Sequence, residues 1–164
     1  MYLYHTVIEQ DSDIHINPQN ALNEGLNIRT VTRLYTNGGD LYPEITDRFK
    51  SINSPKWIDF KIAFGAELVP PTKPYLRFPT FSDKILVFNQ DISSDLFAYI
   101  EDEYMEEETG GGYFTEGLPS KEDLVSQYWE SMLTIEEYLN YKPYKEPEIL
   151  IFETVPAKLI EYIK

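Results

Sequence analysis

The sequence predicts an α+β fold in which helices pack on a small mixed or antiparallel sheet. Segments of strand character and segments of helical periodicity both occur, but they do not alternate regularly, as a parallel α/β fold would require. The chain has 164 residues, an apolar fraction of 42% and a charged fraction of 26%, values typical of one globular domain. Because no repeat or long linker divides the sequence, we expect residues 1–164 to form a single domain, with an acidic flexible loop at about 101–116.

Four elements are predicted in the first third of the chain. Their order is a strand over 2–8, a helix over 18–23, a strand over 30–36 and a helix over 40–52. Aromatic and β-branched residues indicate the two strands. Asn17 suits an N-cap, Pro18 suits the first helical position and Gly25 suits the position after a helix, while Asp40 can cap the second helix.

The rest of the chain is predicted to hold an extended segment, two strands and three helices. Their order is a proline-rich extended segment over 70–82, a strand over 84–89, a helix from Ser93 or Ser94 to 103, a helix over 121–138, a strand over 148–154 and a helix over 157–163. The second helix has the clearest signal, because Leu124 and Tyr128 recur at helical spacing after the capping residue Ser120. Residues 56–69 fit a helix or a strand, and 106–112 have the composition of a flexible loop.

Charge is distributed unevenly along the chain. The net charge is −14, of which residues 83–164 carry −13. Nine acidic residues and no Lys or Arg lie between Ile85 and Ser120. Because phosphate backbones bind proteins through Lys and Arg, this half disfavours nucleic-acid binding. The acidity either maintains solubility or provides a face for a basic protein partner, and an aromatic fraction of 15% supplies side chains suited to such a face.

Several chemistries lack the residues they need. The sequence has no Cys, which excludes disulfides and thiol chemistry and favours a reducing, cytoplasmic location. The run Gly110–Gly112 is not followed by the Lys and Ser or Thr of a phosphate-binding loop. His5 and His15, the two histidines, have no helical pairing, so we expect no metal site. No apolar stretch is long enough for a bilayer and the N-terminal residues lack secretory-signal features, so we expect no membrane association.

His5 and Glu148 are two ionisable residues in strongly apolar strands. His5 is expected to share a strand face with Leu3 and Val7, which directs it into a core or a cleft. Glu148 begins an apolar strand directly after Pro147, where a carboxylate can project into a cleft. Each residue also has a plainer interpretation, His5 as a hydrogen-bonded structural residue and Glu148 as an exposed strand terminus.

Short strings near both ends of the chain form a recognisable series. They are Leu3-Tyr4-His5-Thr6, Glu24-Gly25-Leu26, Arg33-Leu34-Tyr35-Thr36, Glu148-Ile149-Leu150-Ile151, Val155-Pro156 and Leu159-Ile160. This series resembles the motifs of the ADP-ribosyltransferase superfamily, which includes diphtheria-toxin-like and PARP-like enzymes, DarT-type toxins and tRNA 2′-phosphotransferases. The order His, Tyr, Glu is that of the superfamily. The resemblance covers about residues 2–36 and 146–163, and the middle of the chain matches no motif of the superfamily.

The resemblance implies a split sheet and an NAD-dependent transfer of ADP-ribose to a macromolecular target such as a protein. In this hypothesis Glu148 is catalytic and stabilises the cation that develops on the ribose as nicotinamide leaves. His5 hydrogen-bonds a ribose hydroxyl and Tyr35 stacks on the nicotinamide, so that His5, Tyr35 and Glu148 line one cleft. The pyrophosphate is held by one of three arginines, and the sequence leaves the choice open among Arg29, Arg33 and Arg77.

Two other functions stay open at the level of the sequence. The charge distribution favours a non-enzymatic acidic interaction protein, such as an immunity protein, an anti-defence inhibitor or a nucleic-acid mimic. A degenerate member of the superfamily that binds without catalysis is the third possibility. In each case we expect the acidic segment 91–116 to face a basic protein partner or target. The acceptor of the ADP-ribose and the oligomeric state are not determined by the sequence.

Overall fold

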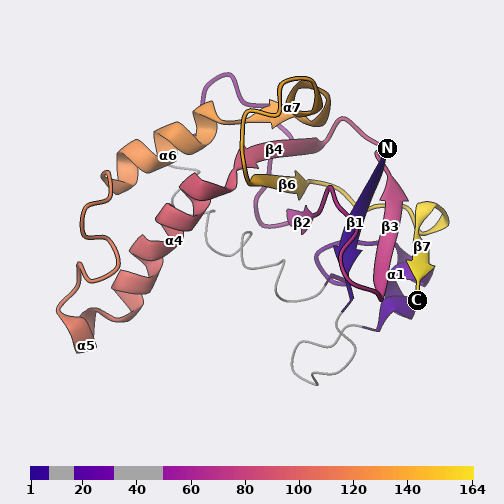
Figure 1. Cartoon of the computed structure of the whole chain (residues 1–164), viewed down its shortest axis with the longest axis horizontal. Coiled ribbons are helices and arrows are strands. Elements are labelled where there is room, and N and C mark those ends of the chain that lie inside the picture. The colour runs from indigo at the N-terminus through magenta and orange to yellow at the C-terminus, as the bar shows by residue number, and fades with distance from the viewer. Residues whose placement is uncertain (8–16, 32–49) are drawn as a thin grey trace.

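The computed structural model describes residues 1–7, 17–31 and 50–164 (Figure 1). These residues form helices and two antiparallel sheets, one with the strand order β1-β3-β7 and one with the order β2-β6-β4-β5, which confirms the α+β class. The elements are β1 (Tyr2–Thr6), α1 (Pro18–Glu24), β2 (Phe64–Ala66), β3 (Tyr75–Pro79), β4 (Ile85–Asn89), α4 (Gln90–Tyr104), α5 (Glu106–Thr109), α6 (Lys121–Glu130), β5 (Leu133–Thr134), α7 (Ile135–Tyr141), β6 (Pro147–Ile151), the 3-10 turn η3 (Ala157–Leu159) and β7 (Glu161–Ile163).

The three-stranded sheet joins the two ends of the chain, because β1 and β7 both pair with β3. Buried and partly exposed residues alternate along β1, so Leu3 and His5 face inward, as predicted. The helix predicted over 157–163 is wrong, since one 3-10 turn is followed by β7. A segment this short has little helical stability of its own, and β3 offers a strand edge on which it pairs.

Capping residues determine the ends of α1, as predicted. The Asn17 side chain accepts the N–H of Gln19 at 2.9 Å, and Pro18 occupies the first turn. Gly25 has φ +92°, and a Cβ built there would lie 2.6 Å from the carbonyl oxygen of Val155. Both the backbone conformation and the close approach therefore require glycine at this position.

The backbone hydrogen bonds of β6 point alternately to its two neighbouring strands, β4 and β2. The N–H of Gln90 bonds to the carbonyl of Glu146 at 3.0 Å, and the N–H of Phe152 bonds to the carbonyl of Lys84 at 3.0 Å. In an antiparallel strand, alternate residues direct both backbone groups to the same neighbour. The even-numbered residues of this segment therefore bond towards β4, and the odd-numbered residues bond towards β2.

A fork separates β2 from β6 after the pair Ala66 and Ile149. The next residue of β6 that faces β2 is Pro147, which has no N–H to continue the ladder. The chain after β2 instead turns to β1, where Glu67 exchanges two backbone hydrogen bonds with Tyr4, at 2.8 and 3.0 Å. The two sheets are joined at this fork.

The four-stranded sheet has a hydrophobic core on each face. The inter-sheet core lies between the two sheets and contains Leu3, Phe64, Leu76, Phe78, Ile85, Val87, Ile149 and Ile151, among others. The helix-side core lies under α4 and α6 and contains Ile58, Phe60, Leu86, Phe88, Leu96, Leu124, Val125, Tyr128, Trp129, Leu150 and Phe152. Successive residues of β4 and β6 alternate between the two cores, as the period of two in a strand requires.

The helix predicted over 121–138 is divided into two. α6 ends at Glu130, and Leu133 then pairs with Val87 of β4. Thr134 begins α7 with a capping box, in which its hydroxyl accepts the Glu137 N–H at 3.1 Å and the Glu137 carboxylate accepts the Thr134 N–H at 2.8 Å. Strand pairing thus interrupts an apolar periodicity that continues through the break.

Helices α4 and α6 run side by side, with α5 at the far end from the sheets (Figure 1). We call residues 90–130 the arm. The predicted helix is present, but it begins at Gln90, before the predicted start at Ser93 or Ser94, because the side chain of Asn89 caps it. Within 101–116, predicted to be a loop, α4 continues to Tyr104 and α5 follows. In the described parts of the chain, no helix has the length and apolar character that crossing a membrane requires.

Two of the remaining predicted elements are strands of the four-stranded sheet. The strands over 84–89 and 148–154 are confirmed as β4 and β6, with β6 beginning one residue earlier and ending at Ile151. The ambiguous segment 56–69 contains β2, and the proline-rich segment 70–82 contains β3. The strand over 30–36 and the helix over 40–52 lie largely outside the described residues; Thr30 and Val31, at the edge of this gap, are not in a strand.

Candidate functional site

Glu148 has its carboxylate buried beneath α4 and α6. Tyr128 of α6 donates its hydroxyl to Oε1 at 2.5 Å, and Ser93 of α4 donates its hydroxyl to Oε2 at 2.8 Å. Burial raises the pKa of Glu148, and the two hydrogen bonds oppose this rise. Both carboxylate oxygens therefore bond to hydroxyls of the protein itself, and the plainer interpretation of an exposed terminus is wrong.

His5 is 1% exposed and lies in the inter-sheet core. Its Nδ1 donates to the carbonyl of Gly65 at 3.2 Å, and its ring meets that of Phe64 edge-on, with 6.5 Å between the centroids. Burial lowers the pKa of His5 to about 4, although the bond to Gly65 favours the charged form, so the ring is neutral at neutral pH. These contacts fit a hydrogen-bonded structural residue.

The structure does not bring His5 and Glu148 together. His5 contacts Phe64, a member of the inter-sheet core, whereas Glu148 contacts Tyr128, a member of the helix-side core. The backbone of the four-stranded sheet separates these two cores. The expectation that one cleft holds both side chains is therefore not met.

The remaining residues predicted for NAD binding are dispersed or undescribed. Tyr35 and Arg33 lie outside the described residues. Arg77 lies on β3, the central strand of the three-stranded sheet, and bonds through Nε and a terminal nitrogen to Glu161 of the edge strand β7, at 3.0 and 2.6 Å. Arg29 is exposed and lines a separate pocket of 410 Å³. Neither Arg29 nor Arg77 lines the pocket at the fork.

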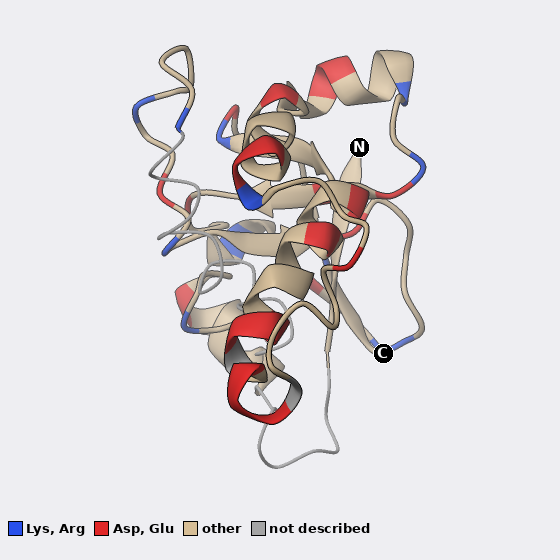
Figure 2. Ribbon diagram, turned by 90° about the vertical axis from the view of Figure 1, so that its left-hand side faces the viewer, with Lys and Arg blue, Asp and Glu red and all other residues tan. Residues whose placement is uncertain are grey.

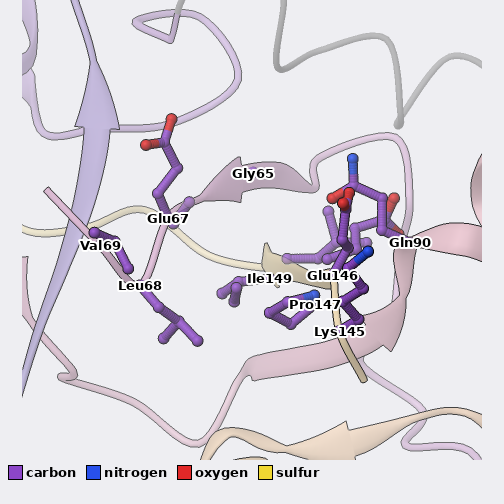
Figure 3. Close-up of a pocket in the computed structure, with 12 residues that line it drawn as sticks. Gly65, Glu67, Leu68, Val69, Gln90, Lys145, Glu146, Pro147 and Ile149 are labelled. Carbon is purple, nitrogen blue, oxygen red and sulfur yellow. The ribbon is translucent and has the colours of Figure 1, made fainter. Parts of the chain in front are cut away.

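The fork between β2 and β6 opens into a pocket of 590 Å³ (Figure 3). Glu67 and Leu68 lie on one side of it, and Gln90, Lys145 and Glu146 lie on the other. Thr6 donates its hydroxyl to the carboxylate of Glu67 at 3.0 Å. The lining thus combines acidic and basic residues with apolar ones such as Leu68 and Ile149. Among the described residues, no group of three or more His, Asp or Glu side chains could hold a metal ion.

The arm carries most of the exposed acidic side chains of the C-terminal half. Lys121 is its single basic residue, and it is paired with Glu103 at 2.5 Å. Figure 2, which looks onto the α5 end, shows acidic residues gathered on α5 and the adjoining part of α4. The exposed acidic residues of the arm are Asp91, Glu103, Glu106, Glu107, Glu108, Glu116, Glu122, Asp123 and Glu130.

An aromatic pair is exposed at the end of the arm. Tyr113 is 71% exposed and Phe114 is 39% exposed, and their rings meet edge-on with 5.0 Å between the centroids. Large exposed aromatic side chains are common anchors in protein interfaces. Here they stand directly after the acidic α5 in the chain, so an apolar contact and a charged contact are available on the same part of the arm.

Asp102 fixes the backbone that presents this pair. Its carboxylate accepts the N–H of Phe114 at 2.8 Å and both the N–H and the hydroxyl of Thr115, at 3.1 and 2.5 Å. Burial alone would raise the pKa of Asp102, but these bonds hold it below the usual range. Tyr99 of α4 also donates to the carbonyl of Pro119 at 2.5 Å. We call α4 one limb of the arm and the chain that returns through α6 the other limb. The hydrogen bonds of Asp102 and Tyr99 connect the two limbs.

Asp102, Ser93 and Tyr128 organise the site, although no pattern in the sequence predicts this role for them. In the sequence Asp102 is one acid among many, and no local pattern marks it as the acceptor for the backbone N–H groups of Phe114 and Thr115. Ser93 and Tyr128 gave signals of helix formation only. Their roles depend on Glu148, which is distant in the sequence.

Compared with protein-family models, with curated proteins and with solved structures, the chain gives no match. The resemblance to ADP-ribosyltransferases therefore stays a prediction from short motifs.

Proposed function

We propose that the protein is a non-enzymatic binding protein whose arm docks on a basic surface of another protein. The observation that carries this proposal is the combination of exposed carboxylates and an exposed aromatic pair on one part of the arm, held by Asp102. Uncompensated acidic charge favours a partner rich in Lys and Arg. Exposed aromatic rings add apolar contact area and bind cationic groups over their faces.

Electrostatic attraction and aromatic contact have separate tasks in this mode of binding. The carboxylates of α5 attract a basic partner before contact, an effect that raises association rates by about 10- to 1,000-fold and weakens with salt. The rings of Tyr113 and Phe114 become buried on contact and slow dissociation. Because Asp102 fixes the backbone at Phe114 and Thr115, less conformational entropy is lost when the partner binds the aromatic pair.

ADP-ribosyl transfer receives less support from the geometry. Such chemistry requires a carboxylate that reaches the ribose. Glu148 is among the residues that line the fork pocket, but both of its carboxylate oxygens are bonded to Tyr128 and Ser93, and His5 lies in the other core. The hypothesis keeps a direct test, because NAD at 100 times its dissociation constant should stabilise an NAD-binding protein by about 2.7 kcal/mol. Our proposal expects no such stabilisation.

The proposal is tested with a synthetic peptide rich in Lys and Arg as the probe. The triple variant Glu106→Gln, Glu107→Gln, Glu108→Gln should slow association about tenfold and reduce its salt dependence. The matched control neutralises three exposed acids outside the arm, with the same change in net charge: Glu24→Gln, Asp83→Asn and Glu136→Gln. This control should associate nearly as fast as the wild type.

Two results would overturn the proposal. Equal effects of the two triple variants would mean that the peptide senses net charge and not the arm. An unchanged dissociation rate in the double variant Tyr113→Ser, Phe114→Ser would remove the aromatic pair from the contact.

A further inference from the structure

Three elements meet at the carboxylate of Glu148, and two of them are the limbs of the arm. α4 supplies the Ser93 hydroxyl near its first turn, and α6 supplies the Tyr128 hydroxyl near its last turn. Glu148 itself belongs to β6, in the middle of the sheet. The carboxylate therefore sits where the arm leaves the sheet and where it returns, at the opposite end from α5 (Figure 1).

Apolar packing already holds this base of the arm. The rings of Phe88 and Tyr128 stack with 4.4 Å between the centroids and 9° between the planes. Phe60 and Trp129 pack around them. Such ring contacts exclude water and favour stacked or edge-to-face arrangements, but each is spread over many atoms, whereas a hydrogen bond joins two defined atoms.

A buried carboxylate is a costly addition to such a core. Removing its charge from water costs free energy that hydroxyl bonds only partly return, and an apolar side chain of similar size would be as stable or more stable. Hydroxyl–carboxylate bonds are short and directional, however. Glu148 therefore adds to the aromatic packing two directional bonds, which define how α4 and α6 are placed relative to β6.

We propose that Glu148 is a positioning residue, which fixes the direction of the arm by holding Ser93 of one limb and Tyr128 of the other. This inference rests on the proposed function of the arm. α4 has 15 residues and spans about 22 Å at 1.5 Å per residue, so a rotation of about 10° at its base moves the far end by about 4 Å. A shift of this size would misplace the aromatic pair and the α5 carboxylates relative to a partner.

The test compares two substitutions of Glu148. Glu148→Leu removes both hydrogen-bond acceptors but keeps an apolar contact, whereas Glu148→Gln retains one acceptor oxygen and adds an amide that can donate to the second hydroxyl. Glu148→Leu should weaken binding of the Lys- and Arg-rich peptide at least fivefold without loss of global stability. Glu148→Gln should restore most of the binding, which a purely stabilising role would not predict.

The orientation of the arm can be measured with spin labels attached to introduced cysteines, because the chain has no cysteine of its own that would react with the label. Spin labels on Glu107→Cys and Glu24→Cys report the distance from α5 to α1. Glu148→Leu should broaden or shift this distance distribution. The control Val87→Ala destabilises the inter-sheet core on the other face and should leave the distribution unchanged.

Each outcome separates the two proposals. If Glu148→Leu leaves both the label distances and the peptide affinity unchanged, Glu148 does not position the arm. If the distances change while neutralising α5 has no effect on binding, the positioning role stands and the proposed function fails. Should Glu148→Leu not fold, Ser93→Ala and Tyr128→Phe each remove one hydroxyl and make the same test on one limb at a time.

Discussion

The two faces of the four-stranded sheet bury one ionisable residue each, in very different surroundings. The inter-sheet core is mostly aliphatic and holds His5, which bonds to the backbone carbonyl of Gly65. The helix-side core is rich in aromatic rings and holds Glu148, which bonds to side-chain hydroxyls of two helices. Backbone pairing joins the first face to its neighbouring sheet, whereas the second face contacts its helices mainly through side chains, beyond the direct continuation of β4 into α4. Backbone hydrogen bonds therefore help to fix how the two sheets are placed, whereas side-chain contacts fix how α4 and α6 lie on the other face.

The largest expected effect comes from deleting a buried ring on either face. Phe60→Ala and Phe78→Ala should each lower the free energy of unfolding by about 3–5 kcal/mol. Only Phe60→Ala should also weaken the near-ultraviolet circular dichroism of tryptophan, because Trp57 and Trp129 both pack on the helix-side core. An equal spectral loss in Phe78→Ala would show that the two cores are not independent.

His5 should make stability depend on pH. Its pKa is about 4 when folded against 6.5 when unfolded, so the unfolded chain binds more protons between these values. The contribution is complete above pH 6.5 and is lost as the pH falls towards 4, by up to about 3 kcal/mol. Urea unfolding of the wild type and of His5→Gln across this range measures it. Parallel curves for the two proteins would contradict the prediction.

Glu148 should make the free energy of unfolding depend on pH in the opposite direction to His5. Burial raises its folded pKa above 4.5, so the folded chain binds more protons just above that pH. Its contribution is greatest at low pH and declines as the pH rises through the folded pKa. The bonds from Tyr128 and Ser93 favour the charged form and oppose the rise in pKa, but burial is the larger effect. Glu148→Gln should remove this decline in the same unfolding series, and a decline that persists would have to come from other groups.

The smallest effect is expected at Arg77, which lies away from both cores. Its bond to Glu161 is exposed, and exposed pairs contribute little to stability. Arg77→Gln should leave the thermal unfolding midpoint almost unchanged. The same variant tests the predicted phosphate contact. If NAD stabilised the wild type but not Arg77→Gln, this would support Arg77 as a residue that binds NAD.

Features with local causes could be predicted from the sequence. Asn17, Pro18 and Gly25 determine α1 because capping and left-handed backbone conformations involve only nearby atoms. The apolar run of β4 and the alternation of β1 predicted strands for the same reason. The acidic character of the arm is a property of composition and was equally evident.

Features that depend on a distant partner were decided by the tertiary structure. Leu133 leaves a helical pattern because Val87 offers a strand, and the last residues form β7 because β3 offers an edge. Glu148 read as a candidate catalytic group, yet Ser93 and Tyr128, 55 and 20 residues away, surround it. A pattern within one segment indicates which side chains share a face, but strand order and helix packing decide what that face meets. For this reason the sequence could place His5 and Glu148 on strands, while only the assembled sheet assigned them to opposite sides.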